Sequence, residues 1–317
     1  MPSPADTDRP GAINARPVPH PGRWVALAVI AILVAMMISS FVTNPEWNFP
    51  FMLKVMNFRP VLKGLLFGTI LGTIFSMILG VALGILLAVM RLSDNPILRA
   101  TSFAYTWFFR AIPRYVLLII LGVGLITLYP KFEIGIPFGQ QISHALGLGW
   151  DGTFLTLSLR QWSTTLAMGV VGLGLSEAAY MAEIARAGIL SVDRGQAEAA
   201  QALGMSPGHT MRRVVLPQAM RVIVPPTGNE TIAMVKDTSL LTGMGVSNEL
   251  FFQAQTVASN TYKIMPAYLA AVAWYLIVCT VLGIGQSYLE RYYGRGFGTN
   301  AKRERKVKDL LSRTGDH

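Results

Sequence analysis

The sequence predicts an all-α membrane protein that crosses the bilayer about six times. Of its 317 residues, 52% are hydrophobic and only 14% are charged, whereas a soluble domain carries roughly 25% charged residues. The mean hydropathy is +0.45. Several apolar runs reach the roughly 20 residues that a helix needs to cross a hydrocarbon core about 30 Å thick. Much of the surface is therefore expected to contact lipid rather than water.

Three uncharged runs are long enough to span the membrane on their own, namely Trp24–Val42, Gly64–Met90 and Ile264–Leu289. Three further segments are shorter or carry charges, and we expect them to face protein or a water-filled path. These are Tyr115–Tyr129, Thr164–Ala187 and Val222–Met244, and the uncharged stretch Ala100–Phe109 precedes the first of them. Glycines spaced by four, as at Gly64 and Gly68 or Gly80 and Gly84, should let helix backbones approach closely.

The positive charges orient these spans. Six spans place both termini on one side, and 20 of the 27 Lys and Arg fall in segments 1–23, 91–114, 186–221 and 291–317, which this topology puts inside. Such a bias is expected of cytoplasmic segments, so the net charge of +10 needs no nucleic acid. We expect 1–23 to be a disordered cytoplasmic tail and 291–317 a basic one, whose run Lys302–Lys308 is a solvated face or a contact with anionic lipid.

The long polar connection between the fourth and fifth spans has the clearest local signals. Gln196–Leu203 is rich in Ala and should be helical, and Gly204 can end that helix in a left-handed conformation. Ser206-Pro207 is a helix start. Pro217 should break the second helix just before the next span, so two short helices with a sharp turn are expected.

This connection resembles the EAA loop of bacterial binding-protein-dependent ABC permeases. The family signature is E-A-A, three residues, G, nine residues, then I-x-L-P, and the chain departs from it only in having Val214 at the Ile position. In that family the loop, here 190–218, forms a cytoplasmic coupling helix that docks on an ATPase. The resemblance thus implies ATPase coupling by Glu198, Ala199, Ala200, Leu203, Gly204, Leu216 and Pro217.

Neighbouring segments resemble the polar amino-acid subfamily of these permeases. Tyr180–Gly188 and Lys236–Leu240 are similar to stretches of that subfamily, and Arg110–Pro113 resembles its R-G-T-P element with Ala and Ile in place of Gly and Thr. The resemblance implies a five-helix type I permease domain over 60–290, with 24–42 as an extra N-terminal transmembrane helix. The partners it implies are an ABC ATPase dimer, an extracytoplasmic solute-binding protein, a second permease chain (identical or paralogous) and an amino-acid substrate.

Polar groups inside spans mark a candidate substrate path, because each costs on the order of 3 kcal/mol at a helix centre. Glu177 lies mid-span, and Pro225-Pro226 should unwind the fifth predicted span and free carbonyls that can line a cavity. A zwitterionic amino acid suits such a path, although structural ion pairs of Lys236 and Asp237 are a competing interpretation. The candidate path residues are Glu177, Tyr180, Asn229, Glu230, Asp237, Thr238 and Ser239.

No catalytic or phosphate-binding signature accompanies these features. The sequence lacks G-x-x-x-x-G-K-[ST], H-E-x-x-H and G-x-S-x-G, its four His are scattered, and its single Cys279 rules out an internal disulfide framework. No cofactor or metal is expected, and the energy for transport must come from a partner. Two alternatives remain: a secondary transporter driven by ions bound at Glu177 and Asp237, and a membrane-embedded enzyme. The sequence offers the first no convincing internal repeat and the second no catalytic constellation.

Overall fold

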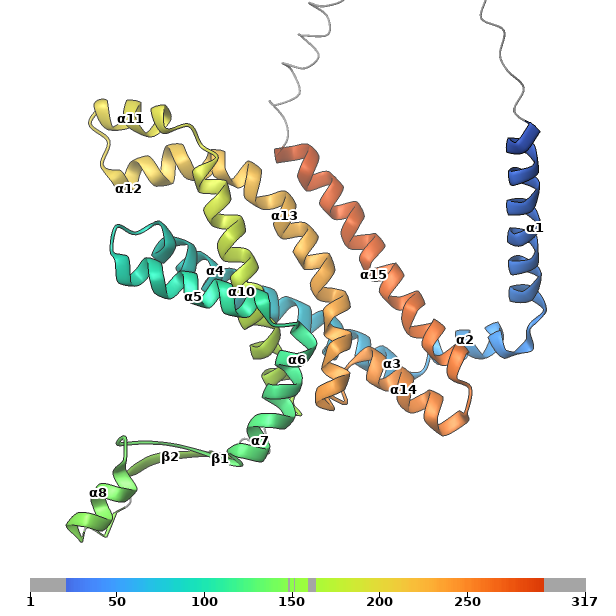
Figure 1. Ribbon diagram of the computed structural model, residues 1–317, viewed down its shortest axis with the longest axis horizontal. Coiled ribbons are helices and arrows are strands. Elements are labelled where there is room, and N and C mark those ends of the chain that lie inside the picture. Colours follow the sequence, from blue (N-terminus) through green and yellow to red (C-terminus); the bar gives the residue numbers. More distant parts are fainter. Residues whose placement is uncertain (1–20, 148, 151, 159–163, 294–317) are drawn as a thin grey trace, which may run out of the picture. The chain divides into compact units, whose positions relative to one another are not determined.

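The computed structural model describes residues 21–293 except 148, 151 and 159–163, and this part of the chain is mostly helical (Figure 1). The chain divides into two units, Met1–Asn48 and Phe49–His317. Most of the two predicted tails, 1–20 and 294–317, lies outside the described residues.

The first unit contains one long apolar helix, α1 (Pro21–Thr43), followed by the short 3-10 turn η2 (Pro45–Trp47). None of the residues of α1 is buried within the chain, as expected of a helix whose surroundings are lipid. The turn after it is fixed locally, because the Asn44 side chain accepts a hydrogen bond from the Glu46 amide at 2.9 Å and the Phe41 and Trp47 ring centroids lie 4.0 Å apart.

The second unit holds all the other elements, and its helices lie in the order α2 (Phe49–Met56), α3 (Arg59–Lys63), η3 (Gly64–Ile70), α4 (Leu71–Leu92), α5 (Pro96–Ala111), α6 (Arg114–Ile119), η4 (Ile120–Gly124), α7 (Leu125–Leu128), α8 (Gly139–Leu146), α10 (Leu166–Leu190), α11 (Arg194–Ala202), α12 (Pro207–Thr210), η5 (Met211–Val215), α13 (Leu216–Asp237), η6 (Thr238–Met244), α14 (Leu250–Thr261) and α15 (Ile264–Tyr293). The segments η3, η4 and η5 are π-helical, and η6 is a 3-10 helix.

Within the described residues, three helical segments are long and apolar enough to cross a membrane, and they contain the three uncharged runs of the sequence: Pro21–Thr43, Arg59–Leu92 and Ile264–Tyr293. Pro96–Ala111 and Arg114–Leu128 add a fourth crossing if this pair, bent by 98°, acts as one span. The fourth and fifth predicted spans, Thr164–Ala187 and Val222–Met244, correspond to helices of suitable length, α10 with 25 residues and α13 with 22. Neither is among the segments that are apolar enough to cross on composition alone, and both carry charged residues. Because α10 packs against α4, α5 and α13, it faces protein, as the sequence predicted.

The sharp bend between α5 and α6 follows from proline chemistry. A residue before proline is disfavoured in the helical conformation, and Ile112, which precedes Pro113, is extended with φ −86° and ψ 129°. Helix α5 therefore stops at Ala111, and α6 begins afresh at Arg114. The bend brings a charged side chain to the start of a helix in the middle of the bundle.

Small residues set the closest helix contacts, as their spacing predicted. Helix α4 packs along α10, and a Cβ atom built on Gly80 would lie only 2.6 Å from Glu177 Cγ. One built on Gly84 would collide with the Met181 side chain. A second contact brings η3 onto the chain just before α14, where a Cβ on Gly68 would overlap the main chain of Asn248.

A fully buried acid, Glu249, links η3, η6, α14 and α15 beside this second contact. Its carboxylate caps α14 by accepting hydrogen bonds from the Phe251 amide at 2.6 Å and the Phe252 amide at 3.2 Å. It also accepts from the Thr69 hydroxyl at 2.9 Å and the Tyr275 hydroxyl at 2.7 Å, which come from η3 and α15. A buried carboxylate is tolerated when its oxygens are bonded in this way, so we assign Glu249 a structural role.

Two predicted helix breaks are wrong. Pro217 lies in the first turn of α13, but helix continues without a break from Pro207 to Asp237 through the π-helical segment η5, so this proline does not end the helix. The pair Pro225-Pro226 also lies inside α13 without ending it. The neighbouring helix also contacts the backbone at this point, since Gln286 Nε2 of α15 donates to the Pro225 carbonyl at 3.3 Å.

One small hairpin departs from the all-α prediction. Strands β1 (Lys131–Gly135) and β2 (Thr153–Ser158) pair antiparallel between α7 and α10, with α8 in the connection between them. Its side chains are mostly exposed, and the register shifts between Ile134 and Gly135. The rest of the described architecture is helical.

Replacing Gly68 by Ala should lower the free energy of unfolding by about 1–3 kcal/mol, the usual cost of overpacking a tight contact, because the added methyl group meets main-chain atoms of Asn248 that cannot rotate away. The matched control is Gly285→Ala, where a Cβ atom meets nothing within 4 Å. Thermal unfolding of the detergent-solubilised chain measures both. Equal unfolding temperatures for the two variants would show that η3 does not pack as described.

Candidate functional site

The polar connection after α10 folds as its residues predict. Asp193 caps α11, its side chain accepting a hydrogen bond from the Gly195 amide at 2.7 Å. After the helix, Gly204 adopts φ +82°, the left-handed conformation that glycine reaches at little cost. Ser206 and Pro207 then begin α12, and the Ser206 hydroxyl lies 3.0 Å from His209 Nδ1. The first short helix and the turn after it are confirmed, but the second helix is not short, because it continues through η5 into α13.

The exposed side chains of this connection include the apolar residues Ala199 and Leu203. Leu203 is 85% exposed although it is a large aliphatic residue, and Glu198 and Ala199 are also exposed. Ala200 is only 5% exposed and packs inward, because α11 lies against α12 and η5. The remaining predicted coupling residues, Leu216 and Pro217, are exposed at the start of α13. The exposed Leu203 side chain lies at the C-terminal end of α11, beside the turn at Gly204.

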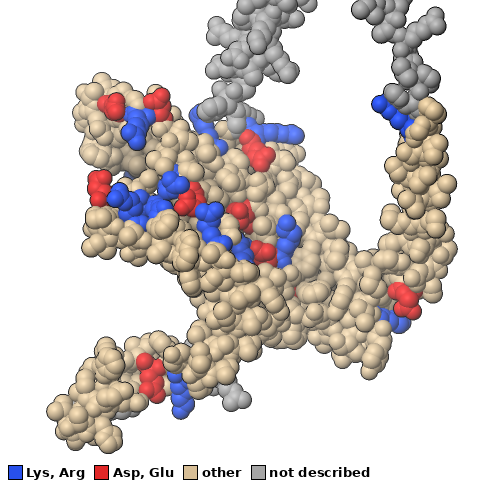
Figure 2. All heavy atoms as spheres, in the orientation of Figure 1, with Lys and Arg blue, Asp and Glu red and all other residues tan. Residues whose placement is uncertain are grey.

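A second site lies where α6, α10 and α13 meet. The Arg114 guanidinium is 2.8 Å from Glu177 and 3.7 Å from Glu230, and it also pairs with Asp237. The Glu177 side chain is fully buried, Arg114 is 13% exposed, and Glu230 and Asp237 are 27% and 29% exposed. In Figure 2, charged side chains of both signs gather over the middle of these helices. The cluster is therefore partly open, with its buried end at α10.

Aromatic and unpaired polar groups complete the cluster. The Tyr180 ring lies under two guanidinium groups, with its centroid 4.8 Å from Arg114 Cζ and 5.7 Å from Arg110 Cζ. Among the described residues, the Glu177 Oε1 atom is buried without a hydrogen-bond partner. A buried carboxylate oxygen in this position can accept a donor from outside the chain.

The other predicted path residues lie outside this cluster. Asn229 accepts a hydrogen bond from Gln286 Nε2 at 2.8 Å. Thr238 is fully buried and its hydroxyl donates to the Val235 carbonyl at 2.7 Å, while the Ser239 hydroxyl donates to the Lys236 carbonyl at 2.6 Å. The structure thus brings Glu177, Tyr180, Glu230 and Asp237 together, but not these three.

Sequence reasoning missed Arg114, the residue that joins the cluster. Its partners Glu177 and Asp237 are 63 and 123 residues away along the chain, so no local spacing could reveal the contacts. A usable signal was nevertheless present. Three carboxylates in membrane-depth segments need a cation, and Arg114 follows the Pro113 break directly, with apolar residues after it.

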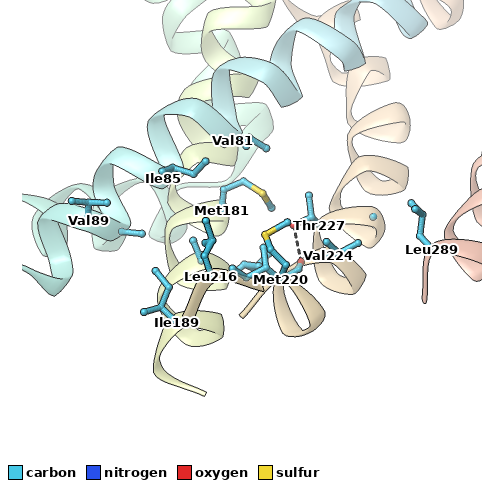
Figure 3. A pocket seen from close by; sticks show the side chains of 15 residues that line it. Val81, Ile85, Val89, Met181, Ile189, Leu216, Met220, Val224, Thr227 and Leu289 are labelled. Atoms are coloured by element: carbon cyan, nitrogen blue, oxygen red, sulfur yellow. Dashed lines mark hydrogen bonds between the residues drawn. The ribbon is translucent and has the colours of Figure 1, made fainter. Parts of the chain in front are cut away.

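An apolar cavity of about 440 Å³ lies between α4, α10 and α13 (Figure 3). Labelled lining residues include Val81 and Ile85 from α4, Met181 from α10 and Met220 from α13. Among the described lining residues, Thr227 supplies the one polar side chain, and its hydroxyl donates to the Ile223 carbonyl at 2.8 Å. These described side chains offer no charged group that could neutralise a zwitterion. The charged cluster around Arg114 is the better candidate for a polar solute.

These features define a class of protein. Apolar helices surround a cluster of charged side chains, and ionisable groups in membrane-spanning segments are candidates for a functional site. A small rigid helix projects from one end of the bundle, where a rigid-body movement can be received from a partner. The chain is thus a polytopic membrane transport subunit.

The comparisons with known proteins identify the family. Residues 80–294 match the family described as binding-protein-dependent transport system inner membrane component. The chain is 41% identical over 293 residues to the arginine transport system permease protein ArgU of Corynebacterium glutamicum, covering 92% of this chain and 86% of that protein. It is also 34% identical over 204 residues to the probable glutamine ABC transporter permease protein GlnM of Bacillus subtilis, covering 64% of this chain and 80% of that protein.

A solved structure supports the same assignment. The chain superposes on a chain from the crystal structure of an amino acid ABC transporter with histidines, with a TM-score of 0.61 and 29% identity, over 77% of this chain and 98% of that one. The chain therefore belongs to the inner-membrane components of binding-protein-dependent transport systems. It is a transport subunit and not an enzyme, so the membrane-enzyme alternative and the ion-driven transporter alternative are both set aside.

Proposed function

We propose that this chain is the permease of an ATP-driven importer. Its substrate is a polar amino acid that carries a positively charged group and crosses the bacterial cytoplasmic membrane through the permease. The observation that carries the proposal is the half-open cluster of Glu177, Glu230 and Asp237 around one guanidinium group. The names of its relatives, which include arginine and glutamine permeases, support an amino acid as the solute.

The balance of charge in the cluster indicates which charged group of the solute the cluster attracts. Three carboxylates lie within 4.0 Å of a single guanidinium, so the contacting groups keep a surplus of negative charge. An ammonium or guanidinium group of a solute would reduce that surplus, whereas a second carboxylate would increase it. The two outer carboxylates, Glu230 and Asp237, are the exposed ones and so the first to meet the solute.

Energy enters through α11 from a partner ATPase dimer, and the chain itself needs no cofactor. The docking surface is formed by Glu198, Ala199 and the projecting Leu203. Helix α11 packs against η5, and from η5 onward the helix runs without a break to Asp237, so a displacement of the docking surface can reach the carboxylates through this contact. This geometry supports a mechanism in which ATP binding moves the coupling helices and opens the solute path.

The orientation follows from the charges and from the docking surface together. Helix α11 must face the cytoplasm to meet an ATPase, and the Lys and Arg bias puts the same segment inside. Both termini then lie in the cytoplasm, and the β1–β2 hairpin lies outside. A second permease chain, identical or paralogous, and an extracytoplasmic solute-binding protein complete the importer.

Substituting the outer carboxylates, as Glu230→Gln or Asp237→Asn, should raise the KM for uptake of L-arginine about tenfold, since one lost ion pair of about 1.4 kcal/mol changes affinity by that factor. This KM is measured from the uptake of labelled arginine by cells that express the full importer, with the membrane levels of the variants matched. The control is Glu183→Gln on α10, whose carboxylate pairs with Arg186 at 2.8 Å outside the cluster. Unchanged arginine uptake in both variants would remove the cluster from the solute path.

Changing the projecting residue, as Leu203→Glu, should abolish co-purification of the ATPase, because a charge replaces an apolar anchor at the centre of a docked surface. Gln196→Glu is the matched control, since it adds the same charge to the exposed first turn of α11 and removes no apolar group. The ratio of ATPase to permease after affinity purification is the readout. If the Leu203→Glu protein retains its ATPase, coupling does not use this helix.

A further inference from the structure

A second group of arginines lies at the cytoplasmic ends of α4, α5 and α10. Arg91 in the last turn of α4, Arg99 in the first turns of α5 and Arg186 on α10 line an open cavity of about 580 Å³. The Arg91 guanidinium stacks 4.4 Å from the Phe103 ring centroid, and its Nη1 donates to the Arg99 carbonyl at 3.4 Å. The transport site does not use any of these groups.

The cavity is short of negative charge. Arg186 is neutralised by Glu183, through hydrogen bonds of 3.0 and 2.8 Å. No carboxylate of the described residues lies within 4.0 Å of the Arg91 or Arg99 guanidinium, even though Asp94 is in the turn between their helices. Two cations that share a cavity without a counter-ion attract an anion, and guanidinium groups suit phosphate oxygens in particular.

The walls of the cavity continue as an apolar strip toward the membrane. Ala100, Phe103 and Trp107 follow one another at helical spacing on α5, so they lie on one face of that helix. Phe103 is 53% exposed and Trp107 is 65% exposed. Leu92 and Leu190 add apolar surface at the rim. A basic cavity that opens onto apolar side chains at the membrane boundary has the form of a lipid headgroup site.

We infer that this cavity binds the phosphate group of an anionic phospholipid in the cytoplasmic leaflet. The phosphate oxygens contact the Arg91 and Arg99 guanidinium groups, and an acyl chain lies along Phe103 and Trp107. The inference rests on the orientation given under the proposed function. A free phosphate shares the headgroup chemistry but gains nothing from the apolar strip, which is the reason for assigning the ligand to lipid.

The test measures binding of dioleoyl phosphatidylglycerol to the full-length chain in detergent by native mass spectrometry, with phosphatidylcholine and inorganic phosphate as parallel ligands. The double variant Arg91→Gln/Arg99→Gln should bind phosphatidylglycerol at least about tenfold more weakly, because each basic residue near the surface contributes about 1 kcal/mol. The matched control is Arg212→Gln/Arg213→Gln, which removes two exposed cytoplasmic charges outside the cavity and should change binding less than twofold.

Two further variants separate charge from hydrocarbon contact. Arg91→Lys/Arg99→Lys should restore binding in part, and Trp107→Ala should weaken binding of the dioleoyl lipid more than that of a short-chain phosphatidylglycerol. The inference is overturned if the Gln double variant binds the lipid as the parent chain does, or if inorganic phosphate binds as tightly as the lipid. Loss of the ATPase from that variant with lipid binding intact would assign the arginines to a protein contact instead. None of these readouts requires transport, so they stand apart from the test of the proposed function.

Discussion

Arg114 is the group on which the organisation of the bundle centre depends. Its single guanidinium meets a carboxylate of α10 and two of α13, and these acids belong to segments that are far apart in the chain. Burying a carboxylate without a partner costs several kcal/mol. The bend at Ile112-Pro113 is therefore a condition for the fold as well as a local turn, because it brings the cation to the place where the buried Glu177 needs it.

The cluster and the coupling surface are linked through backbone geometry. Glycine at position 80 leaves room for the Glu177 side chain against α4, which fixes the inner end of the cluster. The outer end belongs to α13, which continues from the coupling connection without a break. In the proposed transport cycle, a movement of α11 is passed through its contact with η5 to Glu230 and Asp237, which would change their distances to Arg114 and so their attraction for a cationic solute.

The sequence predicts elements better than it predicts contacts. Apolar run length located α1, α4 and α15, and the turn at Gly204 followed from glycine alone. The proline predictions failed at 217 and at 225–226, where helix continues through the prolines, because local sequence rules do not include the packing that holds α13 against α10 and α15. Arg114 and Glu249 were missed for a related reason: the partners of a buried charge are set by tertiary packing, which leaves no trace in local spacing.

The central claim is that Arg114 and Glu177 stabilise each other inside the bundle, and a double-mutant cycle on the free energy of unfolding tests it most directly. Arg114→Gln alone should cost about 3–5 kcal/mol, because it strands a buried charge. Adding Glu177→Gln should recover part of that loss, so that the two substitutions interact by at least about 1 kcal/mol. Strictly additive effects would show that Arg114 and Glu177 do not stabilise each other.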